Sequence, residues 1–271
     1  MKTDPLSALL HRNAGQHGPA MLMYHAVTPG TGTPAWPWAV SMQRFRDQLD
    51  FLAAAGYATP TLAELVSRPA EAWLGRTAVI TFDDGYADNL AACAELQKRG
   101  MRASWFVVTG AIGEAPIWPA DGRPAGRLLN AAELRGMDAA GMEIGSHTVG
   151  HVRLTEVDDA RLHHELQDSR ATLQDLLGHP VGSFAYPFGA WDARCAAAVR
   201  QAGYAAACTT RTGWALRDDD PYRLRRLTVF NSDTASSLAR KLLFASNEVS
   251  WNTIARHFVQ QTQARLGMRA S

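Results

Sequence analysis

The sequence lacks several features that would assign it to a class at once. No apolar run is long enough to cross a membrane, and the N-terminal stretch lacks the apolar core of a secretory signal. The three cysteines are far apart and odd in number, with no spacing typical of a zinc ribbon or a redox pair. We therefore expect no membrane insertion and a cytoplasmic location, or an extracytoplasmic one if a leader is missing from this sequence.

The sequence also lacks an excess of positive or negative charge. The 27 basic and 26 acidic residues leave a formal net charge of +1. This balance offers no broad electrostatic surface for nucleic acid, which we exclude as a partner, and protein partners stay unknown. With 271 residues, of which 46% are hydrophobic, the chain can bury a sizeable core, so we expect one main domain.

Short apolar runs typical of buried strands recur along the chain and alternate with segments of helical periodicity. The predicted strands are Ala20–Tyr24, Thr77–Phe82, Ala103–Thr109, Glu143–Gly145, Ser183–Tyr186, Ala205–Thr209 and Leu224–Phe230. The predicted helices include Met42–Ala55, Ala87–Gly100, Asp158–Leu177 and Trp191–Gly203. This alternation indicates an α/β fold with parallel strands, either an open doubly wound sheet or a closed barrel. No G-x-G-x-x-G follows a strand, so a dinucleotide-binding fold has no support.

The C-terminal segment has a different pattern. From Thr234 to Met268, apolar residues lie on one face of two predicted amphipathic helices that join near residues 246–250. We expect this segment, residues 234–271, to form a helical extension that packs on a domain of residues 1–233.

A pair of adjacent carboxylates follows one of the predicted strands. The apolar run 78–82 leads directly into Asp83, Asp84 and Gly85. Barrel enzymes keep their active sites at the C-terminal ends of their strands, so two carboxylates at this place suit a catalytic site. Asp and Gly are also common turn residues, and on this motif alone a solvated turn is an equal alternative.

Two histidines four residues apart form the second signal. His147 and His151 follow the predicted strand Glu143–Gly145 in the stretch S-H-T-V-G-H. On one side of a helical turn, both imidazoles can reach a single metal ion. One carboxylate with two histidines leaves coordination positions open for water and substrate, as a catalytic site requires.

Together, T-F-D-D-G and S-H-T-x-x-H resemble the polysaccharide deacetylase family, also called NodB-homology domains or family 4 carbohydrate esterases. The resemblance extends over roughly Met21 to Asn231. It implies a distorted (β/α) barrel with about seven parallel strands. It also implies a divalent metal and the hydrolysis of N-acetyl groups on amino sugars.

By this resemblance, Asp83 is the catalytic base, and Asp84, His147 and His151 are the metal ligands. Zn²⁺ is the expected ion, although the same donors also accept Co²⁺, Ni²⁺ or Fe²⁺. The backbone N–H of Phe188 is at the position of the family's oxyanion donor, a role that needs no particular side chain.

One motif departs from the family's pattern at the arginine that orients the base. Where the family usually has R-P-P-Y-G, this chain has A-Y-P-F-G, which places Ala185 at the arginine position. Arg226, in the last predicted strand, is our candidate replacement. The alternatives are Arg225 in that role, or a plain surface charge at Arg226.

A second departure concerns the general acid. Many family members supply it from a histidine in an L-x-x-H pattern late in the chain, and no such pattern follows the last predicted strand. The stretch M-Y-H-A-V after the first strand instead resembles the subgroup that deacetylates poly-N-acetylglucosamine. His25 is then the expected proton donor, because the first and last strands of a closed barrel are neighbours. A structural histidine is the alternative.

The sequence therefore predicts a metal-dependent hydrolase that removes an N-acetyl group from an amino sugar in a poly- or oligosaccharide. Trp36, Trp38 and Trp118 lie in loops, where they could stack on a sugar ring or close over the core. A deformylase or deacetylase of a small nucleotide- or lipid-linked amino sugar is one alternative. A catalytically silent carbohydrate-binding module is another, and the presence of the base and all three ligands argues against it.

Overall fold

Seven parallel strands form a curled sheet in the computed structural model, in the order β8-β7-β6-β5-β4-β1-β9. The structure describes residues 3–13, 18–73, 75–118, 122–123 and 125–255. The strands are β1 (Ala20–Tyr24), β4 (Ala78–Phe82), β5 (Ser104–Val107), β6 (Glu143–Ser146), β7 (Ser183–Ala185), β8 (Ala206–Cys208) and β9 (Leu227–Thr228). Their side chains are almost all buried, which is why these stretches read as continuous apolar runs.

The sheet curls until its two edges approach each other. Leu224 forms a parallel bridge with Cys208 at the end of β8. A few residues further along, Leu227 and Thr228 pair with β1. One extended segment therefore contacts both edges of the sheet, and the expected distorted (β/α) barrel is confirmed, with the first and last strands as neighbours.

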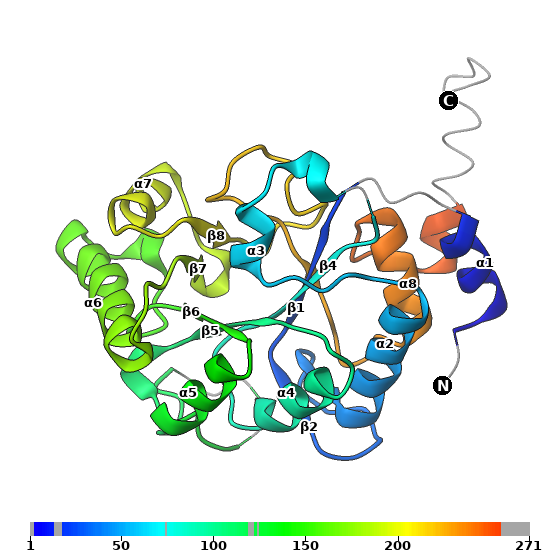
Figure 1. The fold of residues 1–271 in the computed structure, drawn as a ribbon, viewed down its shortest axis with the longest axis horizontal. Helices are drawn as coiled ribbons and strands as arrows, with labels where there is room; N and C mark the ends of the chain where they lie inside the picture. Colours follow the sequence, from blue (N-terminus) through cyan, green and yellow to red (C-terminus); the bar gives the residue numbers. More distant parts are fainter. Residues whose placement is uncertain (1–2, 14–17, 74, 119–121, 124, 256–271) are drawn as a thin grey trace.

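Helices cover the outside of this sheet (Figure 1). They are α2 (Met42–Ala54), α4 (Asn89–Gln97), α5 (Ala131–Ala139), α6 (Asp159–Leu177) and α7 (Ala193–Gln201). Leu49 of α2 and Leu166 of α6 are fully buried in the core between helices and sheet. Helix α6 begins after Asp158, whose side chain accepts a hydrogen bond from the Arg161 N–H, and ends at Gly178 in the left-handed region. These terminal signals explain why its predicted bounds were close to the observed ones.

Several short elements were not predicted. They are α1 (Pro5–Asn13), α3 (Leu62–Val66), a second small sheet of β2 (Ala26–Thr28) and β3 (Ala39–Ser41), and the 3₁₀ turns η1 (Ala70–Trp73), η2 (Thr109–Ala111), η3 (Leu154–Glu156) and η4 (Pro187–Gly189). Most are too short to show a periodicity. The predicted strand Leu224–Phe230 was too long, because the Arg226 N–H donates to the Arg211 carbonyl and only Leu227–Thr228 belongs to β9.

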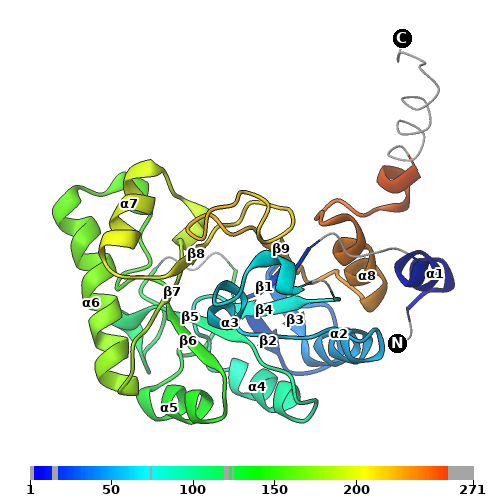
Figure 2. The same cartoon turned by 45° about the horizontal axis from the view of Figure 1, so that its top comes forward.

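Helix α8 (Ala235–Phe244) packs against α1 and α2 at one side of the barrel (Figure 2). Residues 251–255 are helical, and the remainder of the second predicted C-terminal helix, including Phe258, lies outside the described residues. The division into residues 1–233 and 234–271 stays a prediction. Among the residues that the structure describes, no helix combines the length and apolarity needed to span a membrane.

A buried lysine connects α8 to the barrel. Lys241 Nζ donates to the Thr228 carbonyl of β9 at 2.7 Å and pairs with the carboxylate of Asp233. Gln48 of α2 donates to the Asp233 carbonyl and accepts from the hydroxyl of Tyr24 on β1. The C-terminal helix is thus bonded to the strands that close the barrel.

Candidate metal centre

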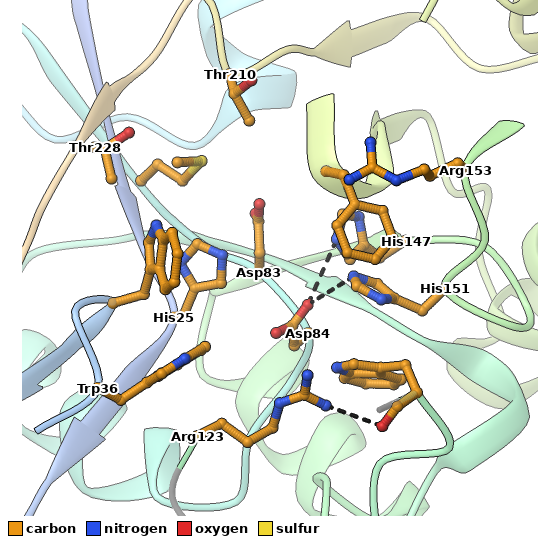
Figure 3. Close-up of a pocket in the computed structure, with 14 residues that line it drawn as sticks. His25, Trp36, Asp83, Asp84, Arg123, His147, His151, Arg153, Thr210 and Thr228 are labelled. Carbon is orange, nitrogen blue, oxygen red and sulfur yellow. Dashed lines mark hydrogen bonds and ion pairs between the residues drawn. The ribbon is translucent and has the colours of Figure 1, made fainter. Parts of the chain in front are cut away.

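The segments that follow β1, β4, β6 and β7 meet at the C-terminal end of the barrel and line one pocket (Figure 3). The residues predicted for the site that line it are His25, Asp83, Asp84, His147, His151 and Phe188. Arg226, the remaining one, is fully buried beside the pocket and contacts Asp83. The barrel therefore gathers side chains from distant parts of the sequence at the end where such enzymes keep their active sites.

Asp84, His147 and His151 form a buried cluster of possible metal ligands. One ligand atom from each residue lies within 4.8 Å of the other two. Asp84 Oδ1 is 3.2 Å from His151 Nε2 and 3.6 Å from His147 Nε2 (Figure 3). Asp84 has a φ of 71°, and Gly85 follows with a φ of 86°. This left-handed pair turns the chain sharply, so the two adjacent carboxylates find different partners.

The two histidines do not lie on a helical turn, contrary to the sequence prediction. His147 follows β6 directly, and Thr148 and His151 have φ values of 71° and 53°. A tight left-handed turn nevertheless brings His151 back beside His147. Their ring centroids are 5.0 Å apart.

Hydrogen bonding prepares His147 as a ligand. Its Nδ1–H donates to the Ala185 carbonyl at 2.8 Å, which leaves the lone pair of Nε2 directed at Asp84. Burial lowers the pKa of His147 to about 4, so its imidazole is neutral at pH 7. Ala185 lacks the family's arginine side chain, but its backbone carbonyl fixes the orientation of this ring.

The donor set fits a divalent cation. Asp84 Oδ1 is buried without a hydrogen-bond donor, and His147 Nε2 presents a lone pair to it. An ionised carboxylate facing imidazole lone pairs in a buried site is unfavourable unless a cation lies between them. One carboxylate and two imidazoles are donors typical of catalytic zinc.

Arg226 binds Asp83 through both guanidinium nitrogens. The two hydrogen bonds, from Nη1 to Oδ1 and from Nη2 to Oδ2, measure 2.6 and 2.8 Å. Nε donates to the Thr209 carbonyl, so the guanidinium is fixed in its plane. Burial raises the pKa of Asp83, but the charge of Arg226 outweighs burial and lowers it, so Asp83 stays ionised. Arg225, the alternative partner, pairs instead with Asp218.

His25 lies across the pocket from the two imidazoles of the cluster, with Asp83 and Asp84 between them (Figure 3). Its ring packs edge-on against Trp36 at a centroid distance of 5.8 Å, and its Nδ1 is buried without a hydrogen-bond partner. Trp36, Trp38 and Trp118 all line the pocket, and they also pack in a hydrophobic cluster beside it, so both alternatives stay open.

Phe188 lies over the histidine side of the pocket. Its ring centroid is 4.6 Å from that of His151, and its side chain is 49% exposed. Its φ of 59° is in the left-handed region, and Gly189 follows at 66°. A Cβ at Gly189 would lie 2.0 Å from Thr210 Oγ1, so this turn requires glycine. Tyr186, by contrast, is a fully buried core residue.

Four further polar lining residues were not predicted from the sequence: Arg123, Arg153, Thr210 and Thr228. Arg153 is two residues after His151, and this proximity is a signal that could have found it. Its guanidinium carbon lies 4.4 Å from the centre of the Phe188 ring. The other three come from segments without a motif, so only the folded chain shows that they reach the pocket.

Comparison with known proteins assigns the chain to a family. Residues 73–207 match the family model described as polysaccharide deacetylase. The chain belongs to the polysaccharide deacetylase family. This deacetylase homologue is 29% identical to YxkH of Bacillus subtilis over 216 residues, which cover 77% of this chain and 70% of YxkH. The matched region includes Asp83, Asp84, His147 and His151 but neither His25 nor Arg226.

Solved structures share the fold of this chain. Streptococcus pyogenes deacetylase PplD in complex with acetate superposes with a TM-score of 0.72 at 23% identity, over 84% of this chain and 99% of PplD. IcaB from Ammonifex degensii superposes with a TM-score of 0.69 at 25% identity, over 85% of this chain and 98% of IcaB. The predicted family and barrel are thus both confirmed.

Proposed function

We propose that this member of the polysaccharide deacetylase family is a metal-dependent hydrolase that removes N-acetyl groups from amino sugars in a poly- or oligosaccharide. The observation that carries the proposal is the division of labour between two neighbouring carboxylates. Asp84 faces two imidazoles in a ligand cluster, whereas Asp83 lies outside that cluster, ionised and bound to Arg226. A ligand and a separate base are what hydrolysis by activated water requires.

Asp84, His147 and His151 would hold the ion. A divalent cation bound there acts as a Lewis acid and lowers the pKa of water toward 7. Asp83 accepts the proton of the attacking water, because its carboxylate retains free lone pairs while both oxygens are bound by Arg226. Arg226 keeps this carboxylate in one orientation and stabilises its ionised form.

Two further groups complete the proposed reaction. The Phe188 N–H would donate to the oxyanion that develops on the acyl group, an interaction typically worth about 3 kcal/mol. His25, on the opposite wall, would donate a proton to the sugar nitrogen as it leaves, because an amine is a poor leaving group unless it is protonated. The tryptophans beside His25 supply flat apolar faces on which sugar rings stack.

The proposal is tested with metal-reconstituted protein on chitooligosaccharides, which carry N-acetyl groups, and on their N-formyl counterparts, with acetate and formate release measured separately. Asp83→Asn should keep its metal and lose roughly 10²- to 10⁴-fold in rate. Asp84→Ala should lose metal affinity as well as activity. Asp168→Asn, at an exposed position on α6, is the matched control and should behave like the wild type. Full metal loading and full activity in both site variants would refute the assignment, and release of formate alone would favour a deformylase.

A further inference from the structure

The turn that connects the two histidine ligands adopts an unfavourable backbone conformation. Thr148 and His151 both lie in the left-handed region, at φ values of 71° and 53°. For residues with a Cβ, this region costs roughly 1–2 kcal/mol each. Such a conformation persists only where surrounding contacts hold it.

Glu165, on the second turn of α6, supplies the central contact. It is fully buried, and its Oε2 accepts hydrogen bonds from the Val149 N–H at 2.8 Å and the Gly150 N–H at 2.7 Å. Arg161 Nη2 lies 2.5 Å from the other carboxylate oxygen and compensates its charge. Hydrogen bonds to an ionised acceptor are stronger than neutral ones, so this carboxylate fixes two successive peptide groups.

The opposite side of the turn is also held by backbone. The Thr109 and Gly110 N–H groups donate to the carbonyls of Thr148 and Val149, each at 3.0 Å. A Cβ at Gly110 would lie 2.6 Å from the Val149 oxygen, so this approach requires glycine. The turn is thus held between η2 and the Glu165 carboxylate.

The two ligands depend on this turn to different degrees. The His147 ring is anchored directly, because its Nδ1–H donates to the Ala185 carbonyl. The Nδ1 of His151 is buried without a hydrogen-bond partner. Among the described residues, no hydrogen bond to Nδ1 orients the His151 ring, so its backbone and its ring contacts with Trp118 and Phe188 place Nε2 beside Asp84.

We propose that Glu165 is a positioning residue of the metal site, which places His151 for coordination by holding residues 149 and 150. This inference rests on the proposed function, because it presupposes that the cluster binds a metal ion. Glu165 does not reach the ion itself. It acts through the backbone, as residues that orient ligands do in other metal sites.

Glu165→Gln keeps the size of the side chain, removes the charge and places an amide N–H₂ near Arg161 or the turn. We expect the dissociation constant for Zn²⁺, measured by chelator competition, to rise about 10- to 100-fold. The absorption spectrum of the Co²⁺-substituted protein should change in intensity, because His151 would bind in a different geometry. Activity should recover in part when Zn²⁺ is raised to saturation.

Gly150→Ala is a second, independent variant. Its Cβ would lie 3.0 Å from Glu165 Oε1 and 3.1 Å from Arg161 Nη2, which pushes the carboxylate from the turn without removing it. The same weakening of Zn²⁺ binding is expected. If Glu165→Gln fails to fold, Gly150→Ala decides the question.

Glu95→Gln provides the matched control. Glu95 is also a buried helical glutamate with arginine partners, but it lies on α4 and contacts Arg46 and Arg99 at the surface. This variant should lose stability and keep the wild-type Zn²⁺ affinity. The inference is overturned if folded Glu165→Gln binds Zn²⁺ as tightly as the wild type with an unchanged Co²⁺ spectrum. If Asp84→Ala also binds normally, the metal site itself is wrong.

Discussion

Two buried ion pairs flank β9, and they share the same chemistry but not the same surroundings. Arg226 precedes β9 and binds Asp83, which lines the pocket. Lys241 approaches β9 from α8, donates to the Thr228 carbonyl and binds Asp233. The Asp233 carboxylate also accepts hydrogen bonds from the Phe230 N–H and the Ser237 hydroxyl, and it does not line the pocket. A buried ion pair alone is therefore no sign of catalysis, and access to the carboxylate makes the difference.

The largest effect should follow replacement of Arg226. We call Arg226–Asp83 the inner pair, because Asp83 lines the pocket, and Lys241–Asp233 the outer pair. In Arg226→Ala, Asp83 remains as a buried charge without its partner, which we expect to cost about 3–5 kcal/mol of stability. The rate should also fall by roughly 100-fold, because the base is no longer oriented. Urea denaturation and kcat/KM of the metal-loaded protein measure the two effects. Arg225→Ala is the control, and undiminished turnover in Arg226→Ala would refute the proposed role of Arg226.

The outer pair should affect stability alone. Lys241→Met should also cost about 3–5 kcal/mol, since it leaves Asp233 buried and uncompensated. Metal affinity and turnover per folded molecule should stay within a few-fold of the wild type. A large loss of turnover in the folded variant, measured well below its melting temperature, would show that the outer pair also supports catalysis and would break the comparison.

Replacement of both partners sharpens the contrast. Lys241→Met combined with Asp233→Asn should regain much of the stability lost in the single variant, and so should Arg226→Met combined with Asp83→Asn. Only the outer double variant should remain active. The comparison needs the denaturation midpoints and the acetate release of the two double variants and of the single variants Lys241→Met and Arg226→Met. Acetate release by the double variant Arg226→Met with Asp83→Asn would exclude Asp83 as the base.

The smallest effect concerns a buried ionisable residue without an acidic partner. Burial, with a contribution from Arg76, lowers the pKa of His11 to about 4, and its Nε2 lies 2.7 Å from the Tyr57 hydroxyl. The unfolded chain then binds a proton more readily than the folded one. The stability that His11 contributes is complete above pH 6.5 and declines as the pH falls toward 4, by on the order of 1 kcal/mol between pH 7 and pH 5. In His11→Gln this decline should be smaller, and an identical pH profile of the melting temperature would contradict the assignment.

The sequence predicted those parts of the molecule in which one local pattern decides the outcome. Apolar runs identified the seven strands, and the bounds of β1 were predicted without error. The absence of the motif arginine at Ala185 led to Arg226 as the partner of Asp83, and the structure shows this contact at 2.6 Å. The catalytic roles of Arg226 and His25 stay predictions.

The remaining features depend on backbone angles and contacts that no local pattern reveals. Nothing in S-H-T-V-G-H shows that Thr148 and His151 are left-handed, so the helical turn predicted there was wrong. The bond from Glu165 to this turn follows from those angles and could not be foreseen either. Likewise, Arg123 and Thr228 reach the pocket from segments that only the closure of the barrel brings together.

The pairing of β1 with both β4 and β9 bears on how this polypeptide could be divided. A fragment limited to residues 73–207, the part that matches the family model, would contain Asp83 and the three proposed ligands. It would lack β1, so one edge of β4 would be unpaired. Its unpaired amide and carbonyl groups would then be open to pairing with other molecules, and the fragment should aggregate. A fragment that keeps β1 between both of its neighbours therefore has to begin no later than residue 20 and include residue 228.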